Sequence, residues 1–227
     1  MKTSLTIRNA EVVLPVRTER TDVSVINGRI CAIGNEIPDV GEVIDADGLF
    51  LLPGIIDPQV HFREPGADHK EDLHSGSCAA AAGGVTSFLD MPNNTPPVIT
   101  RQRMQGKKQL AAEKSVVNYG FFMGATTDNL EELNAVENVC GIKIFMGSST
   151  GDLLVDDPDV LEKIFANGSR LIAVHAEDES VLKENKELLK DISDVRIHPL
   201  LRNESVALRA TKLAVRFSLK YRRRLHI

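Results

Sequence analysis

The segment that decides the fold is DPQVHFREPG, residues 57–66, which follows the apolar run LFLLPGII of residues 49–56. We expect the apolar run to form a buried strand. Side chains alternate along a strand, which places four polar residues on one face: Asp57, Gln59, His61 and Arg63. Polar groups at the end of a buried strand need a partner, a metal or a substrate. The segment therefore predicts a metal ligand and an anion-binding guanidinium two residues apart.

Downstream of this segment, apolar strands alternate with helices. Further strands are expected at residues 85–91, 116–124, 141–147, 170–175 and 224–227, and helices at residues 72–82, 100–114, 128–137, 158–167, 180–190 and 199–220. This alternation predicts an α/β fold with a parallel sheet covered on both faces. The strand spacing fits a TIM-like (β/α)8 barrel, which needs roughly 250 residues. We therefore expect residues 53–227 to form an incomplete, truncated barrel of five to six units.

The sequence pattern of residues 1–52 predicts a separate small β module. Residues 4–8 alternate in polarity, and residues 22–30 suggest a hairpin whose turn is Asn27-Gly28. Asn-Gly is the strongest short signal for a two-residue hairpin turn. Residues 42–46 and 49–52 complete the module.

Composition argues against several classes of protein. The net charge is −5, and the only basic block, residues 220–224, is expected to be a solvated helix end rather than a nucleic-acid site. No apolar run reaches the roughly 18 residues that a membrane helix needs. Three widely spaced cysteines indicate reduced thiols, and with them a cytoplasmic location.

Unusual polar residues stand at the expected strand ends, where barrel enzymes place their functional groups. His61 and His175 are candidate metal ligands, because neutral imidazole is the commonest nitrogen ligand. Lys143 lies within an apolar strand, where a lysine is costly unless it is paired or chemically changed. It could pair with a carboxylate, be carbamylated by CO₂ to become a bridging ligand, or extend to the surface.

Two other residues suit a substrate anion. Arg63 can bind a carboxylate through two parallel hydrogen bonds, or instead pair with neighbouring Glu64. Asn93 could hydrogen-bond the same substrate or serve as a simple turn residue. The Gly/Ser-rich loop at residues 147–151 could hold an anion, although such a loop alone is a weak signal.

Together these motifs resemble the dihydroorotases of the amidohydrolase superfamily. The resemblance rests on residues 53–66, AAAGGVT (80–86), DMPN (90–93), GIKIFMGSSTG (141–151) and VHAE (174–177). It implies a TIM-like barrel of the amidohydrolase type, with a β-sandwich built from both chain ends. It also implies reversible interconversion of L-dihydroorotate and N-carbamoyl-L-aspartate, in pyrimidine biosynthesis.

The resemblance carries expectations for the site as well. It implies that His61 and His175 bind one or two zinc ions, which a carbamylated Lys143 would bridge, and that Arg63 and Asn93 hold the substrate carboxylate. Gln59 stands where the family usually has the first histidine of a His-x-His pair, so it is a weaker candidate ligand. The family's general-base aspartate is expected beyond Ile227, so no catalytic residue is assigned.

Three hypotheses follow. The first is a dihydroorotase represented by its N-terminal portion, acting on a small-molecule substrate and inactive alone. The second is a non-catalytic dihydroorotase-like partner or scaffold for another pyrimidine-pathway enzyme, suggested by Gln59 and the absent aspartate. The third is an allantoinase or hydantoinase-type enzyme, against which Arg63 and Asn93 count. An open barrel edge also predicts association, for example as a homo-oligomer.

Overall fold

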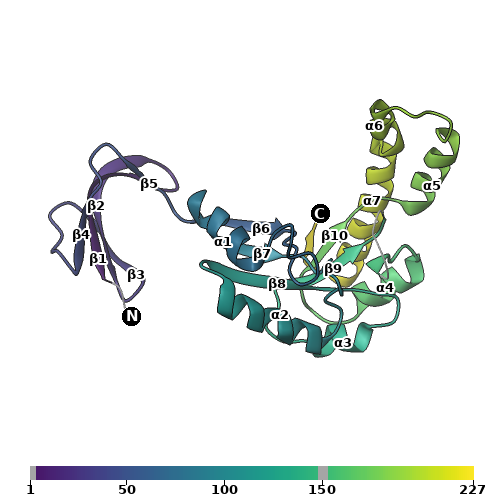
Figure 1. Cartoon of the computed structure of the whole chain (residues 1–227), viewed down its shortest axis with the longest axis horizontal. Helices are drawn as coiled ribbons and strands as arrows, with labels where there is room; N and C mark the ends of the chain where they lie inside the picture. Colours follow the sequence, from purple (N-terminus) through teal and green to yellow (C-terminus); the bar gives the residue numbers. More distant parts are fainter. Residues whose placement is uncertain (1–3, 148–152) are drawn as a thin grey trace. The chain divides into compact units, whose positions relative to one another are not determined.

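The structure is a computed structural model of the chain, and it describes residues 4–147 and 153–227. The chain divides into two compact units, residues 1–54 and residues 55–227 (Figure 1). Most of the loop at residues 147–151, considered above for an anion, lies outside the described residues. No helix in the described part of the chain is long and apolar enough to cross a lipid bilayer.

The N-terminal unit contains one mixed sheet. Its strands are β1 (Leu5–Val13), β2 (Thr18–Ile26), β3 (Arg29–Gly34), β4 (Glu42–Asp45) and β5 (Phe50–Leu51). Their order is β3-β2-β1-β4, with β5 also pairing with β1. Asn27 and Gly28 have φ values of 55° and 76°, as the tight turn between β2 and β3 requires. The predicted hairpin is therefore confirmed.

The second unit is built on six parallel strands. They are β6 (Ile55–Val60), β7 (Val85–Asp90), β8 (Asn118–Gly124), β9 (Gly141–Phe145), β10 (Ile172–His175) and β11 (Leu225–His226). Each strand pairs with its neighbours in sequence, in the order β11-β10-β9-β8-β7-β6. Sequential parallel order with intervening helices is the arrangement of a TIM-like barrel, so the predicted incomplete barrel is confirmed.

Helices connect these strands, and α2, α3 and α4 lie along one side of them (Figure 1). The helices are α1 (Leu73–Ala82), α2 (Arg101–Lys114), α3 (Leu130–Ala135), α4 (Pro158–Ala166), α5 (Glu179–Leu188), α6 (His198–Leu201) and α7 (Glu204–Tyr221), with a 3₁₀ turn at Val195–Ile197. Side chains of Asp72, Thr100, Asp157 and Asp178 accept hydrogen bonds from first-turn amides, which fixes where four helices begin.

One predicted helix begins later than expected, and one predicted strand is wrong. The helix expected over residues 199–220 is broken, because Asn203 is extended and its side chain caps α7 by accepting from the amides of Ser205 and Val206. The apolar run of residues 49–56 is not one buried strand. Pro53 and Gly54 separate β5 from β6, and Leu49 and Ile56 are 61% and 62% exposed.

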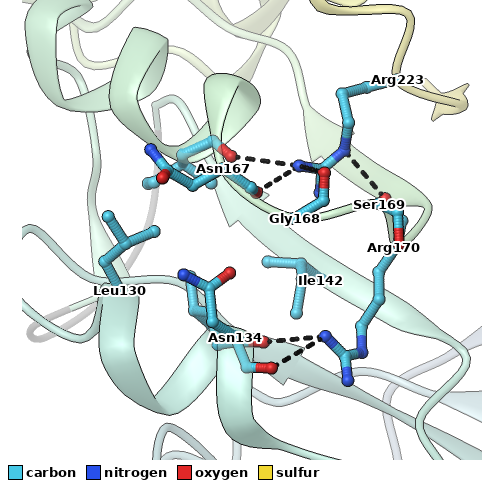
Figure 2. Close-up of a pocket in the computed structure, with 10 residues that line it drawn as sticks. Leu130, Asn134, Ile142, Asn167, Gly168, Ser169, Arg170 and Arg223 are labelled. Atoms are coloured by element: carbon cyan, nitrogen blue, oxygen red, sulfur yellow. Dashed lines mark hydrogen bonds between the residues drawn. The ribbon is translucent and has the colours of Figure 1, made fainter.

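The basic block at residues 220–224 is also not simply solvated. Arg223 is buried, and its guanidinium donates to the carbonyls of Phe165 and Gly168, at 3.3 and 2.8 Å, and to that of Asn167 (Figure 2). Arg170 donates in the same way to carbonyls at the end of α3, including that of Asn134 at 3.2 Å. Both arginines satisfy carbonyls that a helix end leaves without partners.

Candidate active site

The first part of the candidate site lies where β6 and β7 end. Strand β6 ends at Val60, so His61 and Arg63 lie in the loop that follows rather than on the strand. His61 Nδ1 lies 2.6 Å from Asn93 Oδ1, which brings two of the expected site residues together. An amide oxygen can only accept, so Nδ1 carries the hydrogen and Nε2 is left as the basic nitrogen. That nitrogen could bind a metal.

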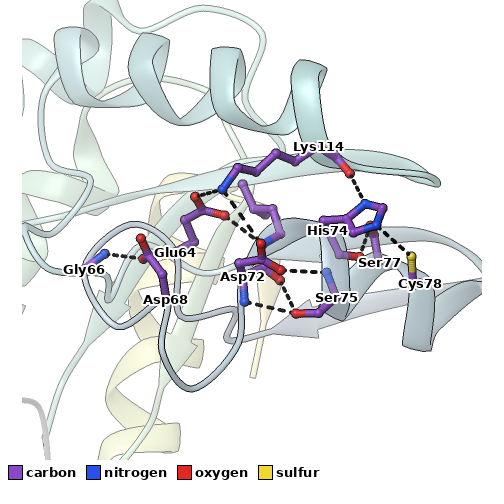
Figure 3. A network of polar contacts seen from close by, with 10 residues as sticks. Glu64, Gly66, Asp68, Asp72, His74, Ser75, Ser77, Cys78 and Lys114 are labelled. Carbon is purple, nitrogen blue, oxygen red and sulfur yellow. Dashed lines mark hydrogen bonds and ion pairs between the residues drawn. The ribbon is translucent and has the colours of Figure 1, made fainter.

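Arg63 is exposed and has no ion pair among the residues that the structure describes. The alternative partner, Glu64, is engaged elsewhere (Figure 3). The buried Glu64 carboxylate accepts from the amide of Leu73 at 2.8 Å and from the Lys114 ammonium. The Arg63 guanidinium is therefore available to an external anion, and the Arg63–Glu64 salt bridge considered from the sequence does not form.

The second part of the site lies on β9 and β10. Lys143 is 1% exposed, and its ammonium makes no hydrogen bond or ion pair within the described residues, so it neither reaches the surface nor pairs with a described carboxylate. Its Nζ lies 5.2 Å from the centroid of the Phe145 ring. Burial lowers the pKa of Lys143 to about 8. A substantial fraction of the amine is therefore neutral near physiological pH, and the neutral form is the one that reacts with CO₂.

His175 is held by a carboxylate. Its Nε2 lies 2.5 Å from Glu177 Oε2, and the same oxygen accepts from Arg202 at 3.0 Å. The His175 ring also stacks against Phe145, with centroids 6.3 Å apart, so Phe145 is a common neighbour of His175 and Lys143. A carboxylate on one ring nitrogen fixes a histidine's orientation and presents the other nitrogen, the arrangement usual for metal-ligating histidines.

Among the described residues, no hydrogen bond or ion pair joins His61, Asn93 or Arg63 to Lys143 or His175. Across residues 4–147 and 153–227, no three His, Cys, Asp or Glu side chains are grouped closely enough to hold a metal. Gln59 is exposed at the end of β6. The residues nevertheless suit a metal chemically: His61 and His175 each have one ring nitrogen anchored, and Lys143 is buried with no counter-charge among the described residues.

A buried polar group beneath the loops of the site was not predicted from the sequence. Lys107 of α2 and Asp90 of β7 form an ion pair of 2.7 Å, and both side chains are almost wholly buried. Helical spacing carried a signal for Lys107. Met104 and Ala111, three residues before it and four after, are buried on the same face of α2.

Imidazole, lysine and guanidinium groups lie at or near the carboxyl ends of these parallel strands, where barrel enzymes carry their active sites. Residues 50–208 match the amidohydrolase family model. The chain belongs to the amidohydrolase family.

The chain is similar to members of the family that are named as two different enzymes, allantoinase and dihydroorotase. The chain is 38% identical over 185 residues to an allantoinase of Deinococcus radiodurans, covering 78% of this chain and 41% of that protein. It is 34% identical over 229 residues to a dihydroorotase of Methanosarcina acetivorans, covering 97% of this chain and 48% of that protein. The chain thus spans about half the length of the curated relatives it matches.

Solved structures agree on the fold. An L-hydantoinase from Arthrobacter aurescens superposes with a TM-score of 0.89 at 25% identity, covering 97% of this chain and 51% of that one. A dihydropyrimidinase from Brevibacillus agri gives a TM-score of 0.84 at 28% identity, covering 98% and 51%. These relatives are named as enzymes of small molecules, which agrees with a site at the strand ends.

Proposed function

We propose that this protein is a metal-dependent cyclic amidohydrolase of the dihydroorotase type, which interconverts L-dihydroorotate and N-carbamoyl-L-aspartate. The observation that carries the proposal is the exposed Arg63 guanidinium, which has no ion pair among the described residues and lies two residues after His61 of the His61–Asn93 pair. Both proposed substrates bear a carboxylate, which a guanidinium binds through two parallel hydrogen bonds. Asn93 Oδ1 accepts from His61, so its amide nitrogen is left to donate to the same carboxylate.

The metal ligands are proposed to be His61, His175, a carbamylated Lys143 and, more weakly, Gln59, with one or two zinc ions. Carbamylation forms a bond between the neutral Lys143 nitrogen and the carbon of CO₂ and releases one proton. It converts a buried amine without a partner into the anionic ligand that a cation needs. When bound, zinc supplies a Lewis acid for the amide carbonyl of the substrate. The catalytic base is not assigned to any of the 227 residues.

A second candidate is an allantoinase. It is favoured by 38–39% identity to several allantoinases, higher than the 34–36% to the dihydroorotases. Allantoin has no carboxylate, so this function gives Arg63 no comparable partner. A non-catalytic role beside another pyrimidine-pathway enzyme is a third candidate, favoured by Gln59. Cytoplasmic location and homo-oligomer formation stay predictions.

Calorimetric titration of the zinc-loaded protein with N-carbamoyl-L-aspartate and with allantoin tests the proposal. We expect binding of N-carbamoyl-L-aspartate only, weakened about tenfold or more by Arg63→Gln because a charge-assisted pair of hydrogen bonds is lost. Arg216→Gln removes an exposed arginine of α7 and should leave the affinity unchanged. Preferential binding of allantoin, or equal effects of the two substitutions, would contradict the proposal.

A further inference from the structure

A buried ion pair lies beneath the two loops that carry Arg63 and Asn93. Asp90 and Lys107 are 0% and 2% exposed, and Lys107 Nζ lies 2.7 Å from Asp90 Oδ2. Burial raises the pKa of Asp90 and lowers the pKa of Lys107, while their mutual attraction opposes both shifts. Replacing a buried pair with apolar residues is often neutral or stabilising, so stability alone does not explain it.

The ion pair is connected to the backbone on both sides of Arg63. Asp90 Oδ1 accepts from the amide of Phe62 at 3.0 Å. The buried Asn94 side chain donates from Nδ2 to the carbonyls of Phe62 and Glu64, at 3.1 and 2.9 Å. Backbone groups of Phe62 and Glu64, the two residues that flank Arg63, are thus fixed by side chains from the end of β7 and the loop that follows.

Lys107 ties the same network to the loop of Asn93. Its Nζ donates to Asn94 Oδ1 at 2.6 Å and to the carbonyl of Met91 at 3.1 Å. Met91 and Asn94 flank the segment that contains Asn93. One ammonium group therefore holds both Asp90 and Asn94, and through them it joins the two loops.

The loop after β6 is braced on its outer side as well. Glu64 binds Lys114 and the amide of Leu73 at the start of α1 (Figure 3), and the amide of Thr95 donates to the carbonyl of Pro65 at 3.2 Å. The backbone around Arg63 is held by hydrogen bonds, whereas its exposed guanidinium has no ion pair within residues 4–147 and 153–227. A rigid support under an exposed guanidinium is the arrangement expected of a preorganised anion site.

We propose that Asp90, Lys107 and Asn94 are positioning residues, which lock the loops of Arg63 and Asn93 in register so that both side chains meet one substrate carboxylate. The identity of that carboxylate rests on the proposed function. The positioning itself concerns contacts present without any ligand. Preorganisation of this kind strengthens binding because less conformational freedom is lost when the ligand arrives.

Hydrogen–deuterium exchange of the ligand-free protein tests the positioning. Asn94→Ala removes the bridge between the loops but keeps the ion pair, and Lys107→Met breaks the pair. We expect each to raise exchange about tenfold in residues 61–67 and 91–96 together, since these amides lose a shared constraint. Arg170→Met, which removes hydrogen bonds to the end of α3, should change neither segment. If Lys107→Met does not fold, Asn94→Ala alone decides.

Affinity for N-carbamoyl-L-aspartate then separates positioning from general stability. Asn94→Ala should weaken binding about tenfold in the wild-type background and have little further effect beside Arg63→Gln, because residues that act through one another are not additive. Additive losses, or exchange in the two segments unaltered by Asn94→Ala, would overturn the positioning proposal. Coupled exchange in a protein that binds no N-carbamoyl-L-aspartate would support the positioning and overturn the proposed function instead.

Discussion

Two lysines of the barrel unit are almost completely buried, yet their surroundings are opposite. Lys107 is paired with Asp90, whereas Lys143 has no counter-charge among the described residues. A buried charge without a partner destabilises the fold, and such groups persist mainly where function requires them. The contrast separates a lysine that supports a site from one that we propose to be chemically changed within it.

The same substitution should therefore have opposite effects at the two positions. In metal-free and CO₂-free buffer at pH 7, Lys143→Met should stabilise the protein by about 3 kcal/mol, since each unit of pKa shift corresponds to about 1.4 kcal/mol. Lys107→Met should destabilise it by about 3–5 kcal/mol, because Asp90 is left buried and unpaired. Urea denaturation measures both, and a loss of stability in Lys143→Met would contradict the account.

The shifted pKa of Lys143 also predicts a pH dependence. The folded value is about 8 and the ordinary value is 10.5, so between these pH values the unfolded chain binds more protons than the folded chain. The cost of burying Lys143 is thus fully present below pH 8 and is relieved as the pH rises to 10.5. Denaturation at several pH values should show the advantage of Lys143→Met shrinking across this window; an advantage independent of pH would refute it.

At this scale the sequence was informative wherever a polar residue interrupts or follows an apolar strand. His61, Arg63 and Lys143 could be singled out for that reason. The Asp90–Lys107 pair could not be predicted with the same ease, because its members are separated by 17 positions and only the packing of α2 decides that Lys107, rather than Lys108, faces inward.

At the scale of elements, helix ends show how the barrel unit is held together away from the site. Arg223, just beyond α7, donates hydrogen bonds to four carbonyls at the end of α4, those of Ile164, Phe165, Asn167 and Gly168. Burial lowers the pKa of Arg223, and repulsion from Arg170 lowers it further. Several carbonyl dipoles stabilise the buried guanidinium. One side chain thus joins two helices that are far apart in sequence.

Removing this cap should cost stability without affecting the site. We expect Arg223→Met to lower the free energy of unfolding by about 2–4 kcal/mol, because several buried carbonyls lose their donor. Arg216→Met, at an exposed position of α7, should change it by about 0.5 kcal/mol or less. Urea denaturation compares the two variants, and equal stabilities would show that Arg223 does not cap α4.

Element order followed from hydrophobic alternation, whereas the residues at which helices begin depend on capping side chains such as those of Asp72 and Thr100. The break at Asn203 was missed because the surrounding residues continue to favour a helix, and only the cap of α7 reveals the boundary. Pro53 and Gly54 interrupt the apolar run of residues 49–56, but the separation of β5 from β6 also depends on two sheets with different strand partners.

At the scale of the whole molecule, the repeated strand–helix pattern was enough to predict the barrel, and the sequence motifs were enough to predict the family. What sequence could not supply is the arrangement of the site. His61, Asn93 and Arg63 come from one end of the six-stranded order, and Lys143 and His175 lie nearer the other. Strands β6 and β11 each pair on one side only within the described residues, so expected association through such an edge stays a prediction.

The central claim is that these two groups of residues act as one site for a metal and a carboxylate. The most direct test is the affinity of the protein for N-carbamoyl-L-aspartate, measured by calorimetry with and without zinc. We predict that zinc strengthens binding about tenfold or more, a coupling within the usual range for linked sites, and that Lys143→Met abolishes this effect. An affinity that is the same with and without zinc would contradict the claim.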